Sequence, residues 1–179
     1  MDNNELLALV EQAKNYDAEA LAKLCEHFYP KVHRFVYYRV NTKEDAEDIV
    51  SEVFVKMIKT IEKQKGSFQA WIFKITSNLV IDYYRRRGIQ KKIPLTEDLV
   101  EQREEPKARL EDNLTQKELK KAINKLSNEQ QEMITLKFIN GFSNDEISQI
   151  MNKSKEAIRA LQFRALKNLR NIFKEGNIK

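Results

Sequence analysis

The chain has 179 residues and a formal charge of +5, from 32 lysines and arginines against 27 aspartates and glutamates. One cysteine and two histidines exclude an intramolecular disulfide and leave no Cys/His spacing typical of a zinc site. Four glycines and three prolines leave little for hairpin turns, which predicts an all-α protein. Because no long uncharged apolar run occurs, a cytoplasmic protein without membrane insertion is expected. Neither a metal nor a cofactor is expected.

The N-terminal part of the chain predicts two helices. Apolar residues at helical spacing indicate a short helix over residues 6–13, and Asp17 is placed to cap the next one. The apolar stripe of that second helix, residues 21–36, keeps its phase through Pro30, which favours one kinked but continuous helix. Cys25 lies on the stripe and is expected to be a buried structural thiol.

An acidic helix follows. Thr42 and Asp45 resemble a capping box with Asp in place of Glu, and they open a helix with a wide apolar face. Asp45, Asp48 and Glu52 lie on another face, near the helix N-terminus. There they are either surface charges stabilised by the helix dipole or a docking surface for a basic partner.

The helix predicted over residues 68–87 has two contrasting faces. It follows a polar break with Gly66 at the turn and Ser67 as the expected N-cap. One face is apolar, with Phe68, Ile72, Ile75 and Leu79 at helical spacing, and Trp71 lies close enough to it to be structural. The rest mixes amides and aromatic rings with the cations of residues 85–87, which suits a nucleic-acid strand. The alternative is a core helix whose final arginines favour its negative C-terminus.

The last third of the chain predicts four helices after an acidic, proline-containing linker at residues 89–113. Three capping-box patterns occur in succession: Thr115 with Glu118, Ser127 with Gln130, and Ser143 with Glu146. They predict helices at about residues 116–126, 128–139 and 144–151, and Ser154 caps a fourth over about 155–173. The short connection between the last two is typical of a helix-turn-helix, although any small helical bundle has short connections.

The fourth of these helices is strongly basic. Leu161 falls on its apolar stripe, whereas most of its lysines and arginines point elsewhere. A basic helix entered from a capped turn suits a DNA major groove, where its first turns reach base edges and later cations hold phosphates. The alternative is an ordinary solvated face.

Three stretches together resemble a known family. DAEDIVSEVFVKMIK, FQAWIFKITSNLVIDYYRRR and LSNEQQEMITLKFINGFSNDEISQIMNKSKEAIRALQFRALKNLR are similar, in order and spacing, to the signatures of an extracytoplasmic-function sigma factor of bacterial RNA polymerase. The resemblance implies an all-α chain of two helical domains: region 2 at 1–88, the acidic linker at 89–113, and region 4 at 114–179 with a helix-turn-helix. It implies a promoter-specificity subunit, not an enzyme, with core RNA polymerase, promoter DNA and an anti-sigma factor as partners and no small-molecule substrate.

The resemblance also assigns roles to individual residues. Core polymerase binding is carried over to Asp45, Asp48 and Glu52. Contact with the −10 element is carried over to Lys63, Lys65, Ser67, Asn78, Asp82, Arg85, Arg86 and Arg87. Contact with the −35 element is carried over to Ser154, Lys155, Arg159, Phe163, Arg164, Lys167 and Arg170. Many family members have Arg in place of Leu161 and Leu in place of Gln162, so the base-reading side chains do not transfer wholesale. The acidic linker is expected to imitate nascent RNA.

Two other classes of protein compete with this interpretation. A serine recombinase is disfavoured because residues 1–90 show no alternating strand pattern and no serine before Ser51. A one-component DNA-binding regulator remains the main alternative, with the first half as a ligand or dimerisation domain. The exposed cations and amides predicted for residues 68–87 speak against a ligand pocket there.

Overall fold

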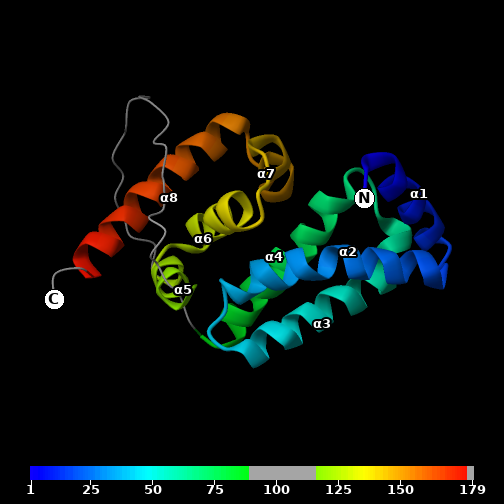
Figure 1. Cartoon of the computed structure of the whole chain (residues 1–179), viewed down its shortest axis with the longest axis horizontal. Helices are drawn as coiled ribbons and strands as arrows, with labels where there is room; N and C mark the ends of the chain where they lie inside the picture. Colours follow the sequence, from blue (N-terminus) through cyan, green and yellow to red (C-terminus); the bar gives the residue numbers. More distant parts are fainter. Residues whose placement is uncertain (89–115, 177–179) are drawn as a thin grey trace.

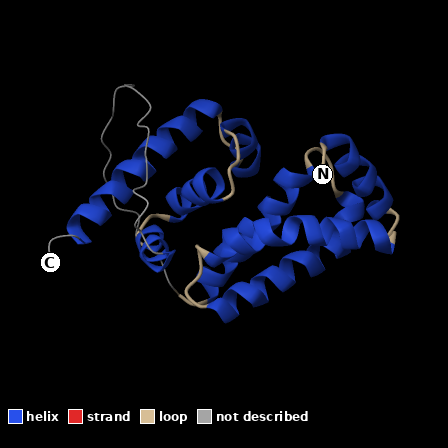
Figure 2. Cartoon of the chain, in the orientation of Figure 1, coloured by secondary structure: helices blue, strands red, loops and turns tan. Residues whose placement is uncertain are grey.

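The computed structural model describes residues 1–88 and 116–176 (Figure 1). Within these ranges all regular structure is helical, which confirms the predicted all-α class (Figure 2). The first domain contains α1 (Asn3–Lys14), α2 (Ala18–Tyr37), α3 (Lys43–Thr60), a 3-10 turn (Ile61–Lys63) and α4 (Phe68–Arg86). The second contains α5 (Gln116–Asn124), α6 (Asn128–Ile134), a π-helical turn (Thr135–Ile139), α7 (Asn144–Met151) and α8 (Lys155–Gly176). The linker predicted at 89–113 lies outside the described residues.

Helices begin where the sequence supplies a capping oxygen. Asp17 accepts a hydrogen bond from the Ala20 amide at 2.8 Å and so starts α2, which continues through Pro30 as one helix. Ser143 and Glu146 form the reciprocal capping box predicted for α7. These local contacts satisfy amides that have no partner inside the helix. The predicted box at Thr115 falls outside the described residues.

Aromatic side chains pack between α2 and α4 in the first domain. The ring centroids of Phe28 and Phe68 lie 5.1 Å apart, and those of Phe35 and Phe73 lie 5.5 Å apart in an edge-to-face arrangement. The Trp71 ring lies 5.6 Å from Phe68 and packs against this core, so its expected structural role is confirmed. Edge-to-face pairs of this kind add stability beyond the apolar area that they bury.

Several apolar residues, Cys25 and Ile75 among them, are less buried than their place on the helical stripes predicts. Cys25 and Ile75 are half-buried and pack against the edge of the core. Partial burial raises the pKa of the Cys25 thiol, in keeping with an unreactive structural cysteine. Conversely, Phe73 lies off the predicted stripe of α4 and yet is fully buried.

Phe73 packs against Phe35 in the first domain and also lies where the two domains pack against each other, with α7 alongside α4 (Figure 1). Phe142, just after the π-helical turn, places its ring edge-to-face with Phe73 at 4.9 Å. In the opposite direction, Tyr38 at the end of α2 packs into the apolar cluster of the second domain with Ile123 and Leu169. Each core thus receives an aromatic side chain from the other domain, and we call this packing the closed arrangement.

Polar contacts cross the same boundary. Two side-chain hydrogen bonds run from α4 to the second domain: Gln69 Nε2 donates to Glu146 Oε1 at 2.7 Å, and Ser77 Oγ donates to Glu132 Oε1 at 2.7 Å. From α2, Arg34 Nη1 donates to the Ile139 carbonyl at 3.3 Å. Lys120 Nζ of the second domain lies 3.9 Å from the centroid of the Tyr37 ring. These polar contacts accompany apolar packing, since residues of both domains, among them Phe73 and Phe142, belong to one buried cluster.

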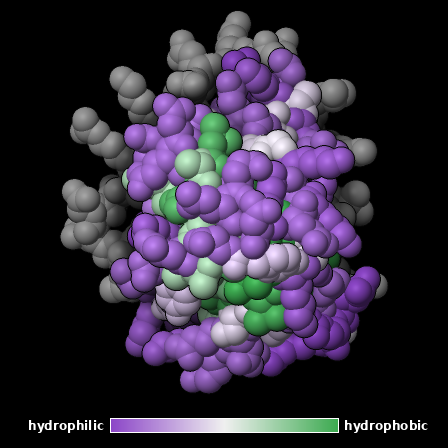
Figure 3. Space-filling view, turned by 90° about the vertical axis from the view of Figure 1, so that its right-hand side faces the viewer, coloured by the Kyte–Doolittle hydropathy of each residue, from purple (hydrophilic) through white to green (hydrophobic). Residues whose placement is uncertain are grey.

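The end of the molecule formed by α1 and its neighbours is mostly hydrophilic, with hydrophobic residues in an interrupted band (Figure 3). Leu7 of α1 and Val55 of α3 are among the exposed large apolar side chains. In the described part of the chain, no helix has the length and apolar character needed to cross a membrane.

Candidate functional site

The acidic residues of α3 occupy two different environments. Asp48 and Glu52 are exposed on the helix surface, as a docking site requires. The only close partner of Glu52 among the described ion pairs is Arg86 of α4, at 3.8 Å. By contrast, the Asp45 side chain is only 15% exposed, because it faces the end of α4.

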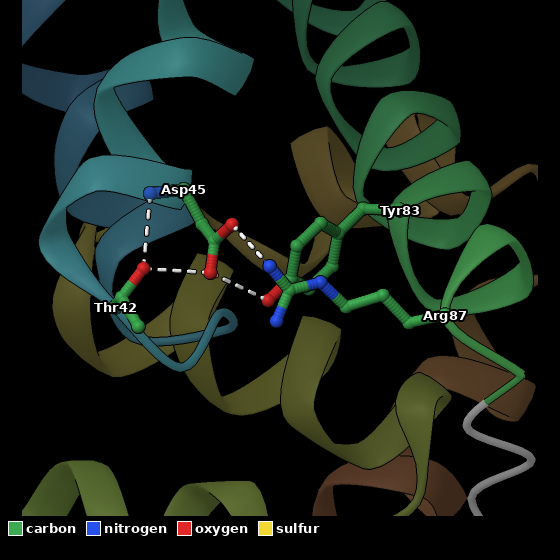
Figure 4. A network of polar contacts seen from close by, with 4 residues as sticks. All are labelled: Thr42, Asp45, Tyr83 and Arg87. Atoms are coloured by element: carbon green, nitrogen blue, oxygen red, sulfur yellow. Dashed lines mark hydrogen bonds and ion pairs between the residues drawn. The ribbon is translucent and has the colours of Figure 1, made fainter.

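Asp45 joins the start of α3 to the end of α4 (Figure 4). Its Oδ2 accepts hydrogen bonds from the Thr42 hydroxyl at 2.6 Å and the Tyr83 hydroxyl at 2.8 Å, and its Oδ1 lies 2.8 Å from Arg87 Nη2. The Arg87 guanidinium also stacks 4.8 Å from the Tyr83 ring centroid. The sequence predicts Asp45 on the docking surface and Arg87 at DNA, whereas the structure pairs the two residues with each other.

The same contacts set the charge of Asp45. The hydrogen bond from Thr42 is the main cause that lowers the pKa of this carboxyl below its usual range. Tyr83 and Arg87 act in the same direction, and together these groups outweigh desolvation, which favours the neutral acid. The carboxylate is therefore ionised at neutral pH and serves as a structural anion.

Replacing Asp45 by Asn is expected to destabilise the protein by about 1–3 kcal/mol at pH 7, because hydrogen bonds to a charged group are lost. A lowered folded-state pKa means that the stabilisation is complete above the unfolded pKa and is lost as pH falls through the folded value. The difference between wild type and variant should therefore shrink below about pH 4. Urea unfolding followed by circular dichroism from pH 7 to 3 measures it.

Asp48→Asn on the exposed face of the same helix is the matched control and should change stability little. Equal destabilisation by both substitutions, or a difference between wild type and Asp45→Asn that stays constant with pH, would contradict the structural role of Asp45.

The α4 face proposed for the −10 element is accessible to solvent. Asn78 and Arg85 are exposed and Asp82 is half-buried, with Arg85 Nη2 2.9 Å from Asp82 Oδ1. All three consecutive arginines thus lie beside an acid, since Arg86 neighbours Glu52 and Arg87 neighbours Asp45. Such exposed pairs contribute little stability and exchange readily, so Arg85 and Arg86 are available to a phosphate.

The loop before α4 is built around a residue that sequence reasoning missed. Gln64 is buried, and its Nε2 donates to the Gly66 carbonyl at 2.7 Å. Gly66 has φ +71°, a conformation that favours glycine, and it is followed by Ser67, which caps α4. Lys63 and Lys65 stay exposed on this braced loop. A glutamine between two lysines gives no periodic signal that would have marked it as buried.

The turn between α7 and α8 has helix-turn-helix geometry. α7 ends at Asn152, whose φ of 51° and ψ of 49° place it in the left-handed region that asparagine tolerates. Ser154 then caps α8, because its Oγ accepts a hydrogen bond from the Ala157 amide at 3.1 Å. Lys155 is exposed at the first turn and lies 2.9 Å from Asp145. Ser154 therefore has a structural role as the N-cap of α8, beside the DNA contact predicted for it.

The remaining side chains of α8 separate into a buried and an exposed set. Leu161 is 4% exposed, which confirms its predicted place in the core. Phe163 is half-buried and offers only part of its ring to a ligand. Four cations proposed for DNA contact are exposed: Arg159, Arg164, Lys167 and Arg170. This cationic surface suits a polyanion.

The described residues contain no cluster of three or more histidine, cysteine, aspartate or glutamate side chains that could hold a metal ion. The arrangement instead offers two exposed basic surfaces, on α4 and on α8, and a separate pair of exposed acids on α3. Binding of a polyanion and of a basic protein surface is the chemistry that such surfaces support.

Comparisons with known proteins agree with this organisation. The Sigma-70 region 2 family matches residues 24–89, and the Sigma-70 region 4 family matches residues 116–169. The ECF RNA polymerase sigma factor BldN of Streptomyces coelicolor is 33% identical over 94% of this chain, which spans 66% of BldN. SigX of Bacillus subtilis, another ECF sigma factor, is 24% identical over 85% of this chain and 82% of its own length.

Solved structures share the fold. CnrH, in complex with the cytosolic domain of CnrY, matches with a TM-score of 0.73 and 19% identity over 94% of this chain and 96% of its own. The sigma factor RpoE of Bartonella quintana, in complex with the anti-sigma factor NepR, has a TM-score of 0.66 and 24% identity over 86% of this chain and 96% of its own. With two sigma-70 regions in family order and ECF relatives along nearly its whole length, the chain belongs to the extracytoplasmic-function RNA polymerase sigma factors.

Proposed function

We propose that the chain is a promoter-specificity subunit that binds core bacterial RNA polymerase and directs it to promoters. In this proposal residues 1–88 bind the polymerase and open the −10 element, residues 89–113 connect the domains, and residues 114–179 read the −35 element. The protein works in the cytoplasm and needs no catalytic activity of its own. The match covers 66% of BldN, so BldN supports this proposal through shared family membership and not through the activity of the whole BldN protein.

The observation that carries the proposal is the presence of two exposed basic helices on two domains, with an acidic surface on a third helix. α4 offers Asn78 and Arg85, and α8 offers Arg159 and Lys167. The exposed acids Asp48 and Glu52 lie on α3. A single-site DNA-binding regulator needs only one of these basic helices. Two DNA contacts and a protein-docking surface fit a subunit that places a polymerase on two promoter elements.

The closed arrangement must open for this function. Elements centred about 25 base pairs apart, as their names state, lie about 85 Å apart along B-DNA at about 3.4 Å per base pair. In the closed arrangement the domain that carries α8 touches α4 directly, through Phe142 and Phe73. One closed molecule therefore cannot occupy both elements, and we propose that the domains separate on the polymerase.

An inhibitor protein is a further proposed partner. The solved relatives CnrH and RpoE were each captured with a second protein, and the partner of RpoE is described as an anti-sigma factor. We propose that this chain is likewise held inactive by an anti-sigma factor.

Reconstituted transcription tests the proposal directly. Core RNA polymerase with the purified protein should give run-off transcripts of defined start site from a genomic fragment library, whereas core alone gives none. Absence of any start-specific transcript would reject the sigma function. Specific duplex binding by the protein without polymerase, together with no transcript, would instead support a one-component regulator.

A further inference from the structure

Arg39, which follows α2, is an arginine enclosed between the two domains. Its side chain has no exposed surface, and its guanidinium carbon lies 4.8 Å from the centroid of the Phe35 ring. The Tyr84 hydroxyl donates a hydrogen bond to the Arg39 carbonyl, which fixes this backbone against α4. Arginine is seldom fully buried unless it is well paired.

The Arg39 guanidinium has fewer hydrogen-bond partners than it has donors. Nη1 donates to Ser77 Oγ at 3.5 Å, while Nε and Nη2 have no hydrogen-bond partner. Glu132 is 8% exposed and bonds to the Ser77 hydroxyl at 2.7 Å, so that hydroxyl links the acid to the guanidinium. Burial lowers the pKa of Arg39, and the nearby Glu132 only opposes this effect.

Stability of the closed arrangement does not explain an arginine at this position. Desolvation of an ion is costly, and a buried ion pair can often be replaced as a whole by apolar residues of similar volume without loss of stability. A guanidinium has five donors arranged to bind phosphate or carboxylate oxygens in pairs. Two unused nitrogens indicate that Arg39 makes its full set of contacts in another state of the protein.

Opening of the domains uncovers Arg39 beside the helix proposed to meet the promoter. Glu132 belongs to α6 and leaves with the second domain, whereas Ser77 and Tyr84 belong to α4 and stay beside Arg39. We infer that Arg39 binds a backbone phosphate of the DNA strand laid along α4 once Glu132, which is joined to it through the Ser77 hydroxyl, has left with the second domain. The inference rests on the proposed sigma function.

The salt dependence of DNA binding tests this role. Holoenzyme assembled from core polymerase and the full chain is titrated, over a range of KCl concentrations, with promoter DNA whose −10 region is already single-stranded. Arg39→Met should weaken binding about 10-fold and reduce the slope of log K against log salt by about 0.7, the value for one phosphate of a single strand.

Two further variants separate a phosphate contact from a structural role. Arg39→Lys keeps the charge and should retain most of the slope. Arg34→Met removes another interface arginine, whose Nη1 contacts the Ile139 carbonyl, and should keep the wild-type slope. An unchanged slope for Arg39→Met, or an equal loss for Arg34→Met, overturns the inference. Failure of the proposed sigma function can be distinguished from failure of this inference, because wild-type holoenzyme would then give no transcript.

Discussion

Reversing the charge of Asp48 and Glu52 together, as Asp48→Lys/Glu52→Lys, is expected to weaken binding to core RNA polymerase about 100-fold, or about 2.7 kcal/mol. Both side chains are exposed on α3, and we propose that they face basic groups of the polymerase. Like charges brought together at an interface cost several kcal/mol, mostly through slower association and lost orientation. Fluorescence anisotropy of labelled protein titrated with core enzyme measures the affinity.

The effect should be specific to position and not to net charge. Glu19→Lys/Glu47→Lys changes the charge by the same amount at exposed sites, where the two acids pair with Lys23 and Lys43. This control should bind the polymerase within about 2-fold of wild type, apart from the general effect of added charge. DNA binding by the second domain should persist in both variants. Equal weakening by the two double variants would contradict a docking surface at Asp48 and Glu52.

Local patterns were sufficient to predict most of the helical structure. Asp17 caps α2 and Ser143 caps α7 at the predicted positions, because a cap depends on residues three or four apart. Pro30 does not interrupt α2, since the apolar stripe on both sides of it packs into one core. The burial of Leu161 was also predictable from spacing alone. Each of these features depends on residues that are only a few positions apart in the sequence.

The contacts that sequence reasoning missed join distant parts of the chain. Asp45 has the spacing of a surface acid, and its partners Tyr83 and Arg87 lie 38 and 42 residues away. Phe73 lies off the apolar stripe of α4 and packs against Phe142 of the other domain as well as against Phe35. An aromatic residue outside the stripe was the one available signal of that second interface. The assignments to −10 and −35 DNA remain predictions.

Fixing the domains in the closed arrangement is expected to abolish transcription, with at least about a 100-fold loss of run-off product. The side chains of Gln69 on α4 and Glu146 on α7 are hydrogen-bonded across the interface at 2.7 Å. Cysteines at these two positions, in a Cys25→Ala background, are joined by a short bifunctional maleimide that contains a reducible bond. Since the two promoter elements lie about 85 Å apart, a joined molecule cannot reach both.

Reduction of the cross-linker provides the control within the same molecule. Cleaved protein keeps both modified cysteines but regains domain separation, so transcription should return to the level of the uncross-linked double variant. Each single-cysteine variant treated with the reagent should stay active, which excludes an effect of the modification itself. Binding of the cross-linked protein to core polymerase should persist, because Asp48 and Glu52 remain exposed on α3. Full transcription by the cross-linked protein would show that the closed arrangement is itself the active one.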